Sequence, residues 1–98
     1  MTDPMHVRWT ESASKDLRGI ARYIRKDNPA AARAVAKATL DAVESLGSFP
    51  LKGREGGIIG TRELVVPRLP YIVVYRVTRT AIQILHIYHG ARNWPAEQ

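Results

Sequence analysis

The 98-residue sequence contains no cysteine, only three histidines and no long hydrophobic run. The absence of cysteine excludes disulfide bonds, thiolate metal sites and a cysteine nucleophile. The histidines lack HxxxH spacing, so we expect no metal and no cofactor. No apolar segment reaches the roughly 18 to 20 residues of a transmembrane helix, and the first nine residues, MTDPMHVRW, lack the pattern of a secretory signal. We therefore expect a cytoplasmic protein that does not enter a membrane.

Acidic residues are also scarce. Nine Asp and Glu stand against 15 Lys and Arg, which gives a net charge of +6 and an isoelectric point near 10.2. Arginine outnumbers lysine by 11 to 4, and guanidinium groups suit bidentate contacts with phosphate or carboxylate. An excess of this kind indicates a nucleic acid or an acidic protein segment as partner, or serves solubility alone. The length and the 45% hydrophobic content suit one globular domain over residues 1–98.

The first half of the chain carries the patterns of one strand and two helices. Residues 5–10 alternate apolar and polar side chains, and Thr10 is suited to cap the helix that follows. That helix is basic on the side opposite its apolar stripe. Asn28 and Pro29 begin a second amphipathic helix, so the two helices form an antiparallel hairpin. The apolar stripes comprise Ala13, Leu17, Ile20 and Ile24 in the first helix and Ala32, Val35, Ala36, Leu40, Val43 and Leu46 in the second.

The second half is rich in strand-forming residues. A glycine-rich basic loop, residues 52–60, leads into TRELVVPRL, then YIVVYRV and AIQILHIYH. No segment of helical length separates these strands, so we expect them to pair as a three-stranded antiparallel meander. The predicted fold is α+β, in the order β-α-α-β-β-β, with both helices packed on one face of the sheet. Alternation within YIVVYRV places Arg76 on the opposite face, which we expect to be open at that end.

The stretch HGARNWP, residues 89–95, allows two interpretations. In one, Gly90 turns the chain out of the last strand and Trp94 packs over the rim of the sheet. In the other, His89 and Arg92 belong to a site, since histidine exchanges protons near neutral pH and arginine binds phosphate. Our hypothesis combines the two: Trp94 anchors the tail and holds His89 and Arg92 at the edge of the open face.

Seven segments in order resemble a known family. A strand, a helix that begins A..DL..I..YI, the turn DNP.AA, and then FP..GR, GTREL, PYIVVYRV and HGARNWP span residues 7–95. This arrangement is similar to the RelE/ParE superfamily of bacterial type II toxin-antitoxin systems. The resemblance implies a small basic toxin that is held inactive by a cognate antitoxin, whose acidic and amphipathic C-terminal segment wraps the toxin surface.

The superfamily has two mechanistic branches. RelE-like toxins cleave mRNA in the ribosome without a metal, and they place an arginine early in the central strand and a tyrosine near the end, where this sequence has Ile72 and Gly90. This departure favours the ParE-like branch, which poisons DNA gyrase by binding. The resemblance therefore implies gyrase or the gyrase-DNA complex as target, and a toxin that is not an enzyme.

Two alternatives stay open. The first is a ribosome-dependent mRNA endonuclease that uses Arg62, Arg76, His89 and Arg92. The second is a toxin-fold protein that has lost toxicity and serves as an antitoxin partner or co-repressor.

Basic and aromatic residues of the first helix, the strands and the tail are the candidate contacts with target or antitoxin. They are Arg18, Arg22, Arg54, Arg62, Arg76, Tyr88, His89, Arg92 and Trp94. Tyr88 qualifies if it faces the open side of the sheet. We also expect Trp9 in the core and His86 in a structural contact.

Overall fold

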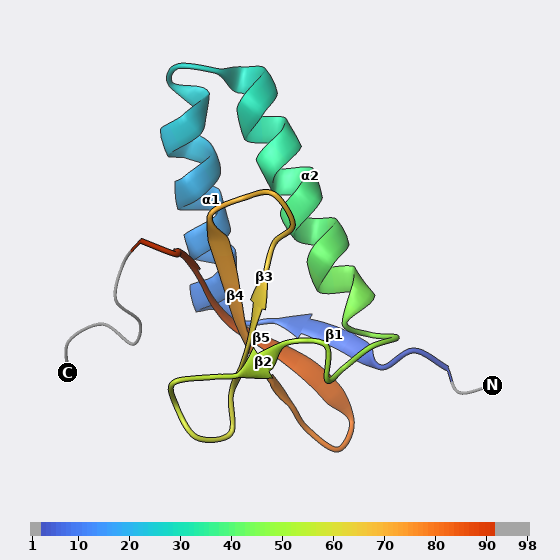
Figure 1. Ribbon diagram of the computed structural model, residues 1–98. Helices are drawn as coiled ribbons and strands as arrows, with labels where there is room; N and C mark the ends of the chain where they lie inside the picture. Colours follow the sequence, from blue (N-terminus) through green and yellow to red (C-terminus); the bar gives the residue numbers. More distant parts are fainter. Residues whose placement is uncertain (1–2, 92–98) are drawn as a thin grey trace.

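The computed structural model describes residues 3–91, whose helices and strands follow the predicted order (Figure 1). The elements are β1 (His6–Trp9), α1 (Glu11–Arg25), α2 (Pro29–Ser45), β2 (Arg54–Glu55), β3 (Arg62–Val65), β4 (Tyr71–Val77) and β5 (Ala81–His89). The sequence does not predict β2, because two residues are too few to show a strand pattern. No helix within residues 3–91 is long and apolar enough to cross a membrane.

Both helices begin where the sequence predicts, because a polar side chain caps each of them. Thr10 Oγ1 accepts a hydrogen bond from the Ala13 N–H at 3.2 Å, and Asn28 Oδ1 accepts one from the Ala31 N–H at 3.0 Å. Each bond satisfies a backbone donor that the first helical turn leaves without a partner. Pro29 opens α2 at a position where its missing N–H costs nothing. The helices form the predicted antiparallel hairpin (Figure 1).

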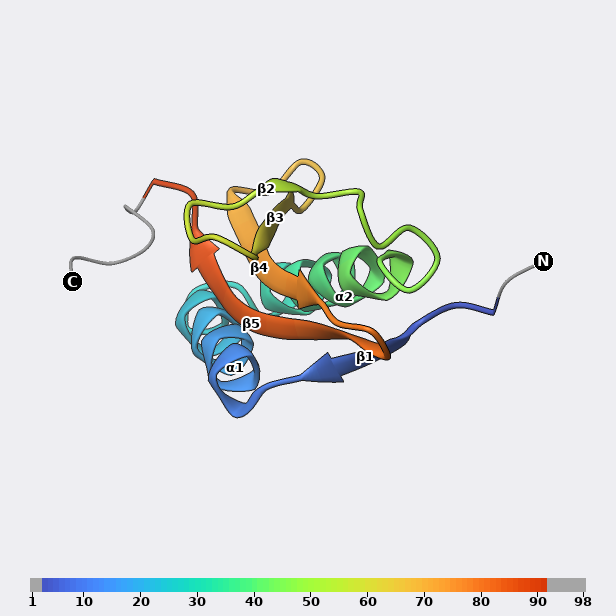
Figure 2. The ribbon, with the colours of Figure 1, turned by 90° about the horizontal axis from the view of Figure 1, so that it is seen from below.

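The strands form one five-stranded sheet in the order β1-β5-β4-β3-β2. The strands β3, β4 and β5 pair antiparallel in chain order, which confirms the predicted meander, and β2 extends its outer edge. At the other edge β1 pairs parallel with β5, with Val7 opposite Ile82. The first and last strands are therefore neighbours. Figure 2 shows the twisted sheet lying across the two helices.

The core lies between the helices and the inner face of the sheet. Leu46, the C-cap residue of α2, and Tyr75 and Ile82 of the central strands are fully buried there. The predicted orientation of β4 is confirmed, because Val73 and Tyr75 belong to the core whereas Arg76 is exposed on the other face. The helices thus cover the inner face of the sheet, and Arg76 is exposed on the outer face.

One position of the predicted stripe in α2 is wrong. Leu40 is 48% exposed, and its neighbour Thr39 is buried at 1% exposure. The Thr39 hydroxyl donates a hydrogen bond to the Val35 carbonyl at 2.8 Å, so its polar group is satisfied within the helix. This bond allows Thr39 to occupy the packed face, where the sequence pattern favoured Leu40. Trp9 is half-buried against the core, in agreement with the prediction.

Candidate functional site

The face of the sheet that points away from the helices carries some of the candidate contact residues. At one end, the Arg76 guanidinium donates to the side-chain oxygen of Gln83 on β5, at 3.1 and 3.4 Å. Further along β4, Ile72 and Val74 are only 8% and 1% exposed. This face is therefore open at the Arg76 end, as predicted, and is closed toward the middle of β4.

A buried carboxylate organises the β2–β3 side of the same face. Glu63 is 8% exposed, and it accepts hydrogen bonds from Arg54 Nη2 and from the Gly57 N–H, each at 3.1 Å. Tyr88 lies close enough to Glu63 and Arg54 for both charges to affect its pKa. Burial raises the pKa of the Tyr88 hydroxyl above 10.0, and the charge of Glu63 raises it further, while the charge of Arg54 lowers it. Arg54 is thus engaged within the protein, and Tyr88 lies on the same outer face, across from the buried Ile72.

Arg62 points to the opposite face of the sheet. It lies across from the core residue Tyr75 in the β3–β4 pair, whereas Arg54 lies across from Glu63. The Arg62 guanidinium donates to the carbonyl oxygen of Gly53 at 2.8 Å and reaches that of Leu51 at 3.4 Å. Arg62 therefore braces the segment before β2 and does not extend the surface around Arg54.

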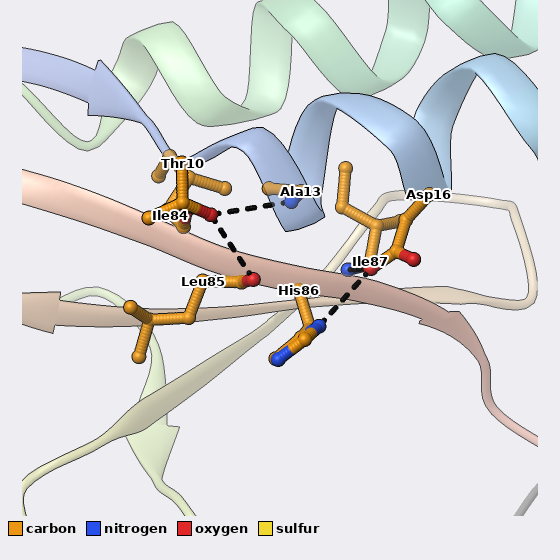
Figure 3. Close-up of polar contacts among 7 residues, drawn as sticks. All are labelled: Thr10, Ala13, Asp16, Ile84, Leu85, His86 and Ile87. Carbon is orange, nitrogen blue, oxygen red and sulfur yellow. Dashed lines mark hydrogen bonds and ion pairs between the residues drawn. The ribbon is translucent and has the colours of Figure 1, made fainter.

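Side chains from the start of α1 cover the edge of β5 beyond β1 (Figure 3). The Thr10 hydroxyl donates to the Ile84 carbonyl at 2.7 Å. One oxygen of Asp16 accepts from the Ile87 N–H at 2.9 Å and lies 3.3 Å from Nδ1 of His86. Ile84 is the last β5 residue that β1 reaches, whereas the Ile87 N–H lies beyond β1 and is satisfied by Asp16 instead of a strand. His86 makes the structural contact predicted for it, and Asp16 is a residue that sequence reasoning missed.

His89 closes β5 in a local turn. Its Nδ1 accepts a hydrogen bond from the Ala91 N–H at 3.0 Å, and its ring meets the edge of the Tyr71 ring with 5.5 Å between centroids. The first contact requires an unprotonated Nδ1. Since His89 lies across from Tyr71, it is at the opposite end of β4 from Arg76. Five residues at about 3.3 Å each separate the two ends by roughly 16 Å.

The outer side of α1 is basic, as predicted. Arg18 and Arg22 are exposed, and neither guanidinium takes part in a hydrogen bond or ion pair with residues 3–91. On the same helix Lys15 lies 3.7 Å from Glu11, one turn away. Arg25, in the last turn of α1, is likewise exposed and makes no hydrogen bond or ion pair with residues 3–91, so the first helix offers three cations to an external partner.

A pocket of about 410 Å³ lies beside the β2–β3 loop. Its lining includes Glu55, Ile58, Ile59, Thr61, Arg62 and Val77. Arg76 and His89 are not part of it. In the described range, no three histidine, aspartate or glutamate side chains come together as metal ligands. Of the candidate catalytic residues that the structure describes, Arg62 thus lines the pocket, whereas Arg76 and His89 lie elsewhere.

Comparison with known proteins identifies this fold. A family model for the ParE toxin of the type II toxin-antitoxin system parDE matches residues 7–94. The chain belongs to the ParE toxin family. A relative from Sinorhizobium fredii, Y4kP, which is provisionally named a toxin, is 43% identical over 89 residues, or 91% of this chain and 92% of the relative.

Solved structures of toxin-antitoxin systems share the architecture. A chain of the chromosomal ParDE system from P. aeruginosa matches with a TM-score of 0.82 and 27% identity, over 90% of this chain and 98% of its own length. A chain of the RelBE2 toxin-antitoxin complex from Mycobacterium tuberculosis matches with a TM-score of 0.60 and 28% identity, over 94% of this chain and 98% of its own length. These matches confirm the predicted α+β fold and the resemblance to RelE/ParE toxins.

In this ParE-family fold the nuclease candidates do not form one group. Arg62 lies on the inner face and contacts backbone, Arg76 lies on the outer face, and His89 lies at the far end of the sheet. Arg92 and Trp94 are outside the described residues. The combined role that we predict for residues 89–95 therefore remains a prediction.

Two of the predicted contacts do come together in this ParE-family toxin. Arg54 and Tyr88 lie on the same face and share Glu63 as a neighbour. Sequence reasoning missed Glu63. The sequence does contain a signal for it, because Glu63 is the one acid in the segment TRELVV and follows the basic loop of residues 52–60. An acid within a half-buried strand requires a cationic or N–H partner, and the loop supplies both.

Proposed function

We propose that this ParE-family toxin inhibits DNA gyrase, or the gyrase-DNA complex, by binding and without cleaving RNA. The separation of Arg62, Arg76 and His89 is the observation that carries the proposal. Metal-free RNA cleavage needs a base, an acid and phosphate-binding cations around one phosphate. Arg76 on β4 and His89 on β5 are roughly 16 Å apart along the strand direction. Arg62 binds a backbone carbonyl on the inner face.

The position of Ile72 supports the same proposal. RelE-like nucleases carry an arginine at the corresponding position, and here the side chain is apolar and 8% exposed. An isoleucine provides no charge for a phosphate. A toxin that acts by binding does not need one at this position.

We infer that a cognate antitoxin neutralises the toxin through an acidic and amphipathic segment. Membership of the ParE family and the toxin-antitoxin systems among its structural neighbours support an antitoxin partner. The net charge of +6 and the exposed Arg18 and Arg22 favour an acidic segment. Exposed apolar side chains such as Tyr23 and Leu40, at 75% and 48%, give such a segment apolar surface to cover. Since the proposed partners are gyrase and the antitoxin, we propose that the toxin acts in the cytoplasm.

The test combines two measurements on the same protein. Purified toxin is added to a gyrase supercoiling assay, and transcripts are mapped for cleavage in cells that express the chain alone. We expect lost supercoiling or trapped cleaved DNA, with transcripts intact, and recovery when the antitoxin is added.

Two other results would contradict the proposal. Codon-phased cuts in transcripts with unaffected gyrase would identify an mRNA endonuclease, and His89→Ala would then show whether His89 takes part. Normal growth, normal supercoiling and intact transcripts would identify a toxin-fold partner of an antitoxin without toxicity.

A further inference from the structure

The turn between β3 and β4 holds an arginine in a backbone conformation that suits glycine. The Leu69 N–H donates to the Val66 carbonyl at 3.1 Å, so residues 66–69 form a β-turn with Pro67 second and Arg68 third. Arg68 has a φ of 66°, as at the third position of a type II turn, where glycine or asparagine is preferred. Within residues 3–91, Arg68 is the one non-glycine residue with a positive φ.

Contacts inside the protein do not account for this arginine. The side chain is exposed, and no hydrogen bond or ion pair joins its guanidinium to any of residues 3–91. By contrast, Arg54, Arg62 and Arg76 each have an internal partner. Backbone strain at a residue without an internal contact points to a contact outside the chain.

The surroundings of Arg68 fit a single carboxylate better than a nucleic-acid backbone. Its turn neighbours are Pro67, Leu69 and Pro70, with no second cation among them. The Pro70 carbonyl accepts a hydrogen bond from the Gly90 N–H at 2.6 Å, which fixes the turn against the end of β5. A phosphate backbone is bound by several cations together. One guanidinium at the rim of an apolar and rigid turn matches one carboxylate at the rim of a protein interface.

We propose that Arg68 is a preformed contact for a carboxylate of the antitoxin's acidic segment, and that the strain of the turn is retained for this contact. The inference rests on the proposed function, which supplies the antitoxin as partner. Because the turn is already fixed, binding orders little additional backbone, and the charge-assisted bond adds to affinity and register.

Two substitutions at the same position separate strain from binding. Arg68→Gly and Arg68→Ala both remove the guanidinium, and glycine alone relieves the strained φ. We expect both variants to bind the antitoxin at least about tenfold more weakly. The Tm of the free toxin should rise by roughly 2 to 8 °C in Arg68→Gly and stay unchanged in Arg68→Ala. Arg79→Ala is the matched control, since Arg79 is exposed in the turn at the other end of β4 (Figure 1), and we expect less than about twofold change in its Kd.

Several outcomes would overturn the inference. Antitoxin binding by Arg68→Ala at wild-type strength would show that no carboxylate is bound, and an unchanged Tm in Arg68→Gly would show that no strain is stored. Variants that bind the antitoxin normally and lose gyrase inhibition would assign the contact to the target. If the Arg68 variants lost only the ability to bind DNA, the ligand of Arg68 would be a phosphate. If the wild-type chain does not bind the antitoxin, the proposed function fails together with this inference.

Discussion

At the scale of single residues, Tyr75 shows how one side chain joins the core to a loop. It is fully buried, and its hydroxyl donates to the Pro50 carbonyl at 2.7 Å and accepts from the Gly53 N–H at 2.8 Å. A Cβ at Gly53 would lie 2.7 Å from the tyrosine ring, so only glycine permits this approach. The segment between α2 and β2 is thereby tied to the middle of the sheet.

We expect Tyr75→Phe to lower the free energy of unfolding by about 1 to 3 kcal/mol, because the Gly53 N–H and the Pro50 carbonyl lose their partner. Urea denaturation measures the change. Tyr23→Phe is the control, since Tyr23 is 75% exposed and its variant should stay within about 0.5 kcal/mol of wild type. Equal effects at the two positions would contradict the role assigned to the Tyr75 hydroxyl.

The same variant predicts a change in pH dependence. Burial raises the pKa of the Tyr75 hydroxyl above 10.0, and the Gly53 N–H and the charge of Arg62 oppose this shift in part. Above pH 10 the unfolded chain loses this proton before the folded chain does, so stability that is fully present below pH 10 is lost as the pH rises. We expect the free energy of unfolding to fall above about pH 10, and to fall less steeply in Tyr75→Phe. Identical profiles for the two proteins would refute this account.

At the scale of elements, the sequence predicts the parts that depend on local periodicity and capping. Thr10 and Asn28 mark both helix starts, and alternation in YIVVYRV gives the correct inner face of β4. The parts that sequence reasoning missed depend on contacts between distant residues. The parallel pairing of β1 with β5 joins the first and last strands. The Asp16 carboxylate accepts a hydrogen bond from the Ile87 N–H, 71 positions later in the sequence.

The candidate site was less predictable than the fold for the same reason. Residue type indicated that arginines were available, and it did not indicate which of them bind inside the protein. Glu63 engages Arg54 and the Gly53 carbonyl engages Arg62, each through the approach of β2 to β3, which local patterns do not show. On the first helix, Arg18, Arg22 and Arg25 remain available for outside contacts.

The contact of α1 with the edge of β5 gives a prediction for this pair of elements. Asp16→Ala removes the acceptor of the Ile87 N–H, which no strand covers on that side. We expect the amide of Ile87 to exchange with solvent at least about tenfold faster, because its hydrogen bond is lost. Hydrogen exchange followed by NMR measures this rate.

Two variants serve as controls for that measurement. Asp16→Asn keeps a side-chain oxygen as acceptor and should retain most of the protection. Asp41→Ala removes a carboxylate that pairs with Lys37 on the exposed side of α2, at 2.7 Å, and should leave the Ile87 amide unchanged. Unchanged exchange at Ile87 in Asp16→Ala would mean that the edge is protected by something other than this side chain.

At the scale of the whole molecule, charge and apolar surface have different roles in binding the antitoxin. The net charge of +6 acts over a distance before contact, whereas apolar side chains such as Tyr23 and Leu40 act once surfaces meet. Surface cations without an internal partner, including Arg18 and Arg22, add to the first effect. Charge should therefore control the rate of association, and burial should control how long the complex lasts.

Raising the salt concentration tests this division. The Debye length falls from about 10 Å at 0.1 M to about 3 Å at 1 M ionic strength, so long-range attraction is screened while buried contacts persist. We expect the association rate with the antitoxin to fall more steeply with salt than the dissociation rate rises, as measured by stopped-flow mixing and dilution. Replacing Arg18 and Arg22 together by glutamine should lower the association rate at low salt and flatten its salt dependence, with little effect on dissociation. An association rate that is independent of salt, or a salt effect confined to dissociation, would show that the cations act in the bound interface and not in the approach.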